Sequence, residues 1–175
     1  MILIKTTIKD GPKLLKSNVY NDNRGFLRET FSEKILKKKF PFDIMSYSRK
    51  NVVRGLHIQL KNPQAKLITV THGKIFDVAV DLRKNSKTFG KIFKTILSEK
   101  NSKSIYIPPG FLHAFLTLDT ENIVVYGCTK YRNKDSEIGV LWNDNDLKVN
   151  WPTKNPLISN KDKKNMSFKD FIKLK

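Results

Sequence analysis

The chain has almost no cysteine: Cys128 is the single one among 175 residues. A lone cysteine cannot form a disulfide within the chain, which agrees with a reducing compartment, and we expect Cys128 to be a buried structural thiol. Long hydrophobic runs are also missing, because the apolar start breaks at Lys5 and no later run approaches the roughly 18 residues of a membrane span. The sequence therefore predicts a soluble, cytoplasmic protein that is neither exported nor inserted in a membrane.

Acidic residues are scarce as well: 16 Asp and Glu stand against 34 Lys and Arg, which gives a net charge of +18. A surface this basic attracts phosphate, so nucleic-acid binding is the first alternative to consider. The lysines are nevertheless scattered, and the short clusters at residues 37–39 and 161–164 lack the aromatic platforms of a nucleic-acid module. We therefore expect no nucleic-acid partner, whereas a nucleoside diphosphate ligand would suit the charge.

Helical periodicity is the third feature that the sequence largely lacks. Two short helices are predicted, over residues 32–39 with Ser32 as N-cap and over residues 167–173 with Ser167 as N-cap and Asp170 three positions later. The rest is typical of short strands between turns such as Asn21-Asp22-Asn23 and Pro108-Pro109-Gly110. The predicted strands cover residues 2–8, 13–19, 26–31, 45–48, 52–59, 66–71, 74–81, 91–97, 104–107, 111–117, 123–129 and 139–142.

This succession of strands predicts the fold class. Many short strands at this spacing indicate a sandwich or barrel, and a jelly roll, the double-stranded β-helix of cupin-like proteins, has about this number of strands. A chain of 175 residues fits one domain, residues 1–175, in which residues 152–175 form a less regular C-terminal tail. We thus predict an all-β, cupin-like barrel with a few short helices.

Three polar residues lie in strand-like, mostly apolar stretches: His57, Lys66 and Tyr126. A base, a cation and a phenolic acid are what proton transfer beside a carbonyl group requires. Because side chains alternate along a strand, His57 and Gln59 share one face, which predicts that both line a pocket. Taken singly, each residue could instead be a solvated side chain or part of the core, so the hypothesis requires that the fold bring them together.

Residues 108–113 match the P-x-G-x-x-H pattern by which cupin barrels deliver a histidine, here His113. Metal-binding cupins combine this pattern with H-x-H and a downstream Glu. In this chain the corresponding positions read His57-Ile58-Gln59 and Gln64, so two of four ligands are missing, and neutral amides bind transition metals weakly. We therefore expect no metal and no cofactor.

Several segments together resemble the dTDP-4-dehydrorhamnose 3,5-epimerase family of nucleotide-sugar epimerases. The similarity extends in order from Arg24-Gly25-Phe26 to Trp151-Pro152, about three quarters of the chain. The segments that carry it are Ser46-Tyr47-Ser48, residues 54–59, Gln64-Ala65-Lys66-Leu67, residues 73–83, Thr88-Phe89-Gly90, Leu97-Ser98-Glu99, residues 107–115 and Trp142-Asn143-Asp144. The resemblance implies a homodimeric, metal-independent jelly roll that inverts the carbons flanking the ketone of a 4-keto-6-deoxy sugar nucleotide, in dTDP-rhamnose biosynthesis for lipopolysaccharide or capsule.

The resemblance also implies roles for particular residues. His57 matches the base beside the C4 ketone, Lys66 the cation facing the enolate oxygen, and Tyr126 the acid on the opposite face. Asp162 would orient His57, although by sequence alone it is merely an exposed charge. The remaining implied substrate contacts are Tyr20, Arg24 and Glu29, reaching in from the partner subunit, and Arg54, His113 and Lys161, which would assist with phosphate or sugar.

Three departures from the family pattern leave the substrate open. Residues 42–45 read Phe-Asp-Ile-Met where the family commonly has Gln and Asn, Gly127 stands where Lys is frequent, and Arg132 replaces a second Tyr after Tyr131. The alternatives are therefore inversion at C3 alone and a sugar linked to GDP, CDP or UDP. A further alternative is a cupin-like nucleotide-binding module without enzymatic activity.

Overall fold

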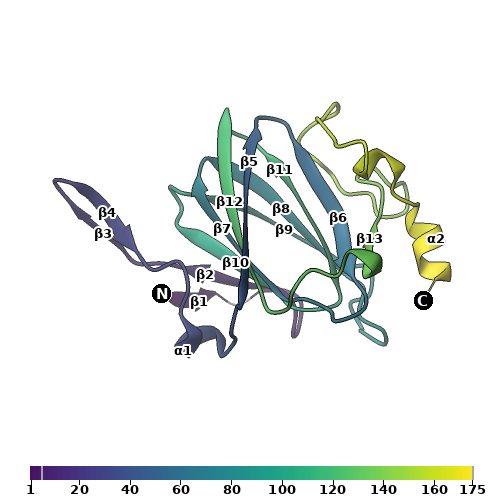
Figure 1. Cartoon of the computed structure of the whole chain (residues 1–175), viewed down its shortest axis with the longest axis horizontal. Helices are drawn as coiled ribbons and strands as arrows, with labels where there is room; N and C mark the ends of the chain where they lie inside the picture. Colours follow the sequence, from purple (N-terminus) through teal and green to yellow (C-terminus); the bar gives the residue numbers. More distant parts are fainter. Residues whose placement is uncertain (5, 175) are drawn as a thin grey trace.

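The computed structural model describes residues 1–4 and 6–174, and its central feature is a pair of facing antiparallel sheets (Figure 1). The first sheet has the order β1 (Ile2–Ile4), β2 (Lys13–Lys16), β10 (Lys103–Ile107), β7 (Lys66–His72), β12 (Glu121–Cys128) and β5 (Phe42–Arg49). The second has the order β13 (Glu137–Gly139), β6 (Val53–Gln59), β11 (Phe111–Thr117), β8 (Lys74–Asp81) and β9 (Ile92–Ser98). This arrangement confirms the predicted all-β jelly roll.

The main core fills the space between the two sheets. Ile68 and Val70 of β7 face Phe111 and Phe115 of β11, and all four side chains are at most 4% exposed. Alternate residues of these strands point inward, as the period of two in a pleated strand requires. Fully burying a side chain of this size stabilises the fold by about 1.5–3 kcal/mol, so the two sheets are held together mainly by apolar contact.

The C-terminal tail covers the outer face of the second sheet. Phe168 and Phe171 of α2 (Phe168–Lys173) pack in one cluster with Val78, Val80 and Leu112. The predicted cap of this helix is confirmed, because the Ser167 side chain accepts the Asp170 backbone N–H at 3.1 Å. The tail before it includes the short helix η2 (Asp162–Lys164), which lies against β6. The irregular tail is therefore fixed to the strand that carries His57.

A hairpin formed by β3 (Val19–Asp22) and β4 (Gly25–Arg28), here called the arm, projects away from the two sheets (Figure 1). The predicted turn at residues 21–23 lies one residue too early: Asp22 pairs with Gly25, whose φ of 135° suits a glycine. The strand predicted over residues 13–19 was wrong at its end, because it divides into β2 and the start of the arm.

The remaining predicted elements are mostly confirmed. β8 and β11 have the predicted bounds. The helix predicted over residues 32–39 is shorter than expected: α1 (Glu33–Leu36) begins after Ser32, whose side chain makes no cap hydrogen bond, and ends before Lys37, which has a left-handed backbone conformation. The strand predicted over residues 139–142 was wrong in position, because pairing with β6 covers residues 137–139 and η1 (Lys134–Ser136) precedes it. None of the described helices is long and apolar enough to span a bilayer.

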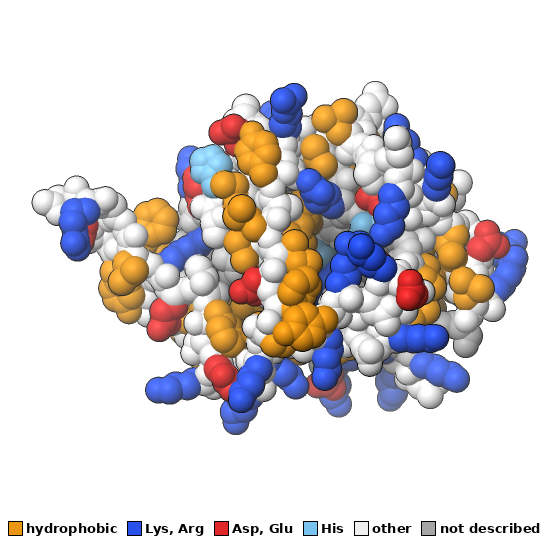
Figure 2. Space-filling model, in the orientation of Figure 1, with side chains coloured by type: hydrophobic (Ala, Val, Ile, Leu, Met, Phe, Trp, Pro, Cys, Tyr) orange, Lys and Arg blue, Asp and Glu red, His pale blue; other side chains and the backbone are white. Residues whose placement is uncertain are grey.

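Apolar side chains remain exposed on one face of the single chain. Met45 and Tyr47 project from β5, and Phe26 and Leu27 from the arm, with exposed fractions between 52% and 73%. Figure 2 shows hydrophobic side chains gathered along the centre of this face and on the base of the arm. Exposed apolar groups of this size are typical of a contact surface with another chain.

Candidate active site

A cavity of about 570 Å³ opens between the edges of the two sheets. Its walls come from β5, β6, β12, β13 and the C-terminal tail, so segments far apart in the sequence meet there. The lining residues are Ile44, Met45, Ser46, Val52, Val53, Arg54, His57, Tyr126, Arg132, Glu137, Leu157, Ile158, Ser159, Lys161 and Asp162. Five residues predicted to be functional are among them: His57, Tyr126, Asp162, Arg54 and Lys161.

His57 and Asp162 form the shortest polar contact of the cavity wall. His57 Nε2 lies 2.6 Å from Asp162 Oδ1, although the two residues are 105 positions apart. Asp162 is only 5% exposed, so the interpretation of this residue as an exposed charge was wrong. Burial raises the pKa of Asp162, but the hydrogen bonds with His57, Gly55 and Ser159 and the charge interaction with His57 together outweigh burial, so the net shift is downward. An ionised carboxylate therefore faces one ring nitrogen of His57.

The backbone around Gly55 allows this close contact. Gly55 has a φ of +118°, and its N–H is a further hydrogen-bond donor to Asp162. A Cβ at this position would lie 2.5 Å from the Cβ of Ala114 on the neighbouring strand. Only glycine tolerates both the dihedral angle and the close approach. Gly55 thus sets the path of β6 immediately before His57.

Tyr126 faces the same cavity from the opposite sheet. Its hydroxyl lies 3.2 Å from the Ser46 hydroxyl of the neighbouring strand β5. Burial raises the pKa of Tyr126 to about 12, and the hydrogen bond with Ser46 opposes that shift only in part. At neutral pH the phenol therefore carries its proton. Because His57 belongs to the second sheet and Tyr126 to the first, the two groups line the cavity from different walls.

Lys66 begins β7 on the inner face of the first sheet. In the pairing of β7 with β12, Lys66 is opposite Cys128 and Ile68 is opposite Tyr126. The two pairs are two residues apart on each strand, so all four side chains lie on the same face of the sheet. Burial lowers the pKa of Lys66, and charge interactions with Cys128, Glu137 and Asp77 oppose this. Lys66 is half-buried and is not among the residues that line the cavity. The structure therefore places Lys66 on the same inner face as Tyr126, and contact between its ammonium group and a substrate stays a prediction.

His113, predicted to assist with substrate, lies deeper between the sheets. It is opposite His57 in the pairing of β11 with β6 and is 5% exposed. Its Nε2 lies 2.8 Å from Oδ2 of Asp77, a carboxylate that is fully buried. The other oxygen of Asp77, Oδ1, has no hydrogen-bond partner among the described residues. His113 and Asp77 thus form a second buried histidine–carboxylate pair behind the cavity wall.

The cations of the wall are held by polar neighbours. Arg54 donates to the Ser48 hydroxyl at 3.0 Å and to the Tyr47 carbonyl at 3.1 Å. Lys161 donates to Glu137 Oε1 at 2.8 Å. Neither Glu137 nor Ser48 was predicted from the sequence, because a carboxylate on a three-residue strand and a serine on an edge strand give no pattern of their own.

Gln59 does not line the cavity, although it shares a strand with His57. Its amide donates to the Asn62 carbonyl at 2.7 Å and to the Tyr131 carbonyl at 3.4 Å, and it accepts the Asn133 N–H at 2.8 Å. The amide is therefore engaged with the backbone of two loops. Contact between Gln59 and a substrate stays a prediction.

The three residues predicted to come from a partner subunit lie on the arm or at its base. Tyr20 is 61% exposed, Arg24 is paired with Asp22 at 2.6 Å, and Glu29 lies 3.6 Å from the amino group of Met1. None of them lines the cavity of its own chain, and Figure 1 shows the arm pointing away from β6. The single chain thus does not bring these three residues to His57.

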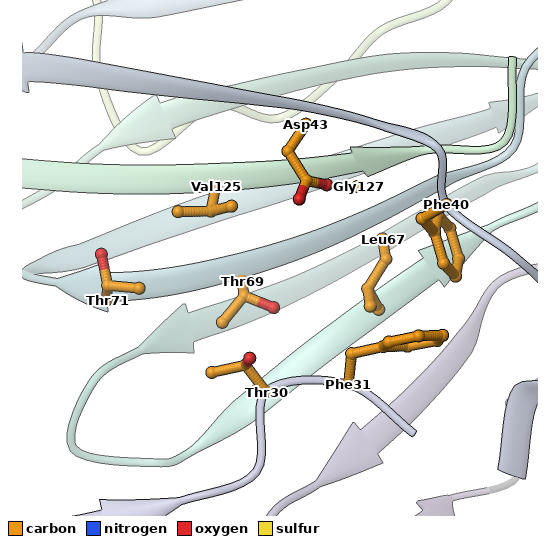
Figure 3. Close-up of a pocket in the computed structure, with 9 residues that line it drawn as sticks. All are labelled: Thr30, Phe31, Phe40, Asp43, Leu67, Thr69, Thr71, Val125 and Gly127. Carbon is orange, nitrogen blue, oxygen red and sulfur yellow. The ribbon is translucent and has the colours of Figure 1, made fainter. Parts of the chain in front are cut away.

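A second, smaller hollow of about 170 Å³ lies on the other face of the first sheet. Figure 3 shows side chains from β7 and β12 on its floor, with Phe31 and Phe40 at one end and Thr30 beside Thr69. Val125 and Gly127 line it, whereas Tyr126 between them points inward to the cavity. Within the described residues, no three His, Cys, Asp or Glu side chains are grouped as a metal ion would require.

Known proteins are similar to this chain in sequence and in fold. Residues 5–170 match the profile of the dTDP-4-dehydrorhamnose 3,5-epimerase family. The dTDP-4-dehydrorhamnose 3,5-epimerase of Shigella flexneri is 41% identical over 177 residues, which cover 97% of either chain.

Two solved structures are also similar. The dTDP-6-deoxy-D-glucose-3,5-epimerase of Legionella pneumophila, in complex with dTDP-4-keto-L-rhamnose, superposes with a TM-score of 0.90 at 37% identity, covering 95% of this chain and 92% of that one. ChmJ, a 3'-monoepimerase from Streptomyces bikiniensis in complex with dTDP-quinovose, superposes with a TM-score of 0.87 at 27% identity, covering 94% and 87%. The matched profile and the identity over nearly the whole length show that the chain belongs to the dTDP-4-dehydrorhamnose 3,5-epimerase family of isomerases.

Proposed function

We propose that the chain epimerises a nucleoside-diphosphate-linked 4-keto-6-deoxy sugar at C3 and C5. The observation that carries this proposal is the pair formed by His57 and Tyr126, which come from different sheets and line one cavity. Inversion of a carbon requires removal of its proton from one face and return of a proton to the other. A base and an acid on different walls meet that requirement without any rotation of the sugar.

In this proposal His57 is the general base. Asp162 accepts a hydrogen bond from one ring nitrogen, which leaves the other nitrogen as the acceptor for the proton of C3. As the C–H bond breaks, its electron pair becomes the enolate of the neighbouring C4 ketone, and the negative charge resides on the ketone oxygen. Lys66 stabilises that oxygen as a cation. Tyr126 then donates its phenolic proton to the opposite face of C3, which restores the C4 ketone. Solvent takes the proton from His57 and returns one to Tyr126, after which the same steps at C5 give the doubly inverted product.

The electrostatics of Tyr126 and Lys66 agree with these roles. Because the pKa of Tyr126 is raised to about 12, the phenol holds a transferable proton throughout the neutral range. Burial lowers the pKa of Lys66, and a partly desolvated ammonium interacts more strongly with an oxyanion than a solvated one does. The carboxylates of Glu137 and Asp77 support the charged form of Lys66.

We propose a dTDP-linked substrate. The Legionella relative binds dTDP-4-keto-L-rhamnose and the Streptomyces monoepimerase binds dTDP-quinovose, so these two complexes contain the same nucleotide. Arg54 and Lys161 supply positive charge in the cavity wall for a diphosphate. Inversion at both carbons is preferred over inversion at C3 alone, because the identity to the 3,5-epimerases is higher than that to the monoepimerase.

We further propose that residues 1–175 act as one domain within a cytoplasmic homodimer. The exposed apolar side chains of β5 and the arm provide a face for a second copy (Figure 2). An arm that reaches across this face would bring Tyr20, Arg24 and Glu29 to the partner's cavity. Those residues have no role in the cavity of their own chain, which supports this assignment.

Deuterium incorporation tests the proposed reaction. The protein is incubated in deuterium oxide with dTDP-4-keto-6-deoxyglucose, and NMR identifies the carbons that acquire deuterium. Deuterium at C3 and C5 supports the double epimerase, and deuterium at C3 alone supports the restricted reaction. The GDP-, CDP- and UDP-linked sugars, assayed in parallel, test the nucleotide. Binding of all these sugars without any incorporation would leave only a nucleotide-binding module and would refute the proposal.

A further inference from the structure

We propose that Arg132 recognises a phosphate group of the substrate, and that Gln59 positions it through the loop backbone. This inference rests on the proposed function, because it requires a nucleoside diphosphate in the cavity. Arg132 is one of the positions at which the chain departs from the family pattern. Its role therefore cannot be transferred from the relatives and has to be inferred from its contacts.

The guanidinium of Arg132 lies in the cavity wall with most of its donors unused. Nε donates to Glu137 Oε2 at 2.7 Å, and Nη2 lies 2.7 Å from the same oxygen. Among the described residues, Nη1 has no hydrogen-bond partner. The side chain is 45% exposed, so these donors are accessible to a ligand that enters the cavity.

The charges around Arg132 do not balance. The second oxygen of Glu137, Oε1, accepts a hydrogen bond from Lys161 at 2.8 Å, so one carboxylate serves two cations. Burial raises the pKa of Glu137, but the hydrogen bonds from Lys161 and Arg132 outweigh it and keep the group ionised. Arg132, Lys161 and Glu137 together therefore carry one positive charge at the cavity wall that no carboxylate of this group compensates.

Gln59 fixes the loop on both sides of Arg132. Its side-chain oxygen accepts the N–H of Asn133, and its nitrogen donates to the carbonyl of Tyr131. The Tyr131 ring in turn contacts the Phe42 ring, with centroids 5.6 Å apart. Gln59 is 7% exposed and lies two residues from His57 on β6. The strand that carries the proposed base therefore also sets the position of Arg132.

The ligand that this arrangement suits is a phosphate. In a nucleoside-diphosphate sugar the base and the sugar are neutral, so the diphosphate is the only anionic group that can compensate the excess charge. The planar guanidinium presents paired N–H groups at the spacing of phosphate oxygens, which a lysine ammonium cannot do. With one edge held by Glu137, the other edge is oriented before the substrate arrives, which reduces the cost of ordering the side chain on binding.

Calorimetric binding of dTDP, dTMP and thymidine tests the role of Arg132. Arg132→Gln should weaken dTDP binding about 10-fold or more, the usual effect of losing a charged hydrogen bond, and change thymidine binding less than twofold. Arg49→Gln, at an exposed arginine that does not line the cavity, is the matched control and should bind all three ligands as the wild type does. Unchanged dTDP binding by Arg132→Gln, an equal loss for thymidine, or no dTDP binding by the wild type would each overturn the inference.

A second variant tests the positioning role. Gln59→Met keeps the side-chain volume and removes the three hydrogen bonds of the amide, so dTDP binding should weaken, by less than in Arg132→Gln. In the double variant the Gln59 change should add almost nothing, because the residue acts through Arg132. Full additivity of the two effects would refute the positioning role.

Because these assays measure binding without turnover, they separate the two proposals. A wild type that binds dTDP but exchanges no deuterium would refute the proposed reaction and leave the result for Arg132 intact.

Discussion

Replacement of Asp162 by Asn tests the histidine–carboxylate pair. The side chain keeps its size, and its oxygen can still accept the Gly55 N–H, but the negative charge 2.6 Å from His57 is lost. A hydrogen bond to a charged group contributes about 1.5–3 kcal/mol. At 1.36 kcal/mol for each factor of ten, the rate of proton abstraction should fall about 10- to 150-fold. Saturating substrate in deuterium oxide, followed by NMR, measures this rate directly.

The control for this prediction is Asp146→Asn, which removes an exposed carboxylate whose side chain makes no described hydrogen bond. It should exchange deuterium at the wild-type rate, and denaturant unfolding should show that Asp162→Asn remains folded. Wild-type exchange by a folded Asp162→Asn variant would refute the claim that the carboxylate orients and stabilises His57. A loss that equals that of His57→Ala would show that the pair acts as an indivisible unit.

Three further predictions concern the backbone, the phenol and the arm. Gly55→Ala should destabilise the fold by about 3 kcal/mol or more, because of dihedral strain and overpacking. Gly90→Ala, with open space around its Cβ position, should cost only roughly 1–2 kcal/mol. Urea unfolding measures the free energy of unfolding of both variants. The absorbance difference between the wild type and Tyr126→Phe should show a phenol that ionises near pH 12 rather than 10. Because the pKa is higher in the folded than in the unfolded chain, the stability that Tyr126 contributes should be lost as the pH rises from 10 to 12. Ionisation near pH 10 would contradict the burial of the phenol. Leu27→Asp on the arm should convert the proposed dimer to a monomer in light scattering and reduce the exchange rate. Ile172→Asp, at an exposed apolar position of α2, is the control and should remain a dimer. A dimeric Leu27→Asp variant would place the interface elsewhere.

The strands of the two sheets could be predicted because local chemistry determines them. Residues 74–81 are mostly apolar and lie between the turn residues His72-Gly73 and Lys84-Asn85-Ser86, so β8 has the predicted bounds. Ser167 and Asp170 lie at capping distance, so the start of α2 was also predictable. These patterns depend only on neighbours within a few positions, which a single sequence displays in full.

Asp162 and Gln59 could not be placed by such patterns. The burial of Asp162 depends on the tail packing against β6, a contact between residues 105 positions apart, and the adjacent lysines make the segment resemble a solvated surface. Alternation along β6 correctly placed Gln59 on the face of His57, but its amide is engaged by two loops whose paths the sequence does not specify. Local periodicity thus predicts the direction of a side chain and not the partner that it meets.

The arm was divided incorrectly for a similar reason. Its two strands pair only with each other, and every residue of β3 is exposed in the single chain. The apolar side chains that normally indicate a buried face, such as Phe26 and Leu27, are therefore turned outward. Exposed apolar side chains of this kind are typical of a surface that another molecule covers, and local periodicity does not reveal such a partner.

The central claim is that His57 and Tyr126 act on opposite faces of one sugar carbon, and the Tyr126→Phe variant tests it most directly. For this variant, NMR in deuterium oxide measures both the amount of epimerised product and the deuterium incorporated at C3, and the ratio of the two is compared with that of the wild type. We predict that exchange persists, because His57 can return a deuteron to the face from which it took the proton, while inversion falls at least 100-fold. Inversion that continues at the wild-type ratio would show that another group protonates the second face and would contradict the account.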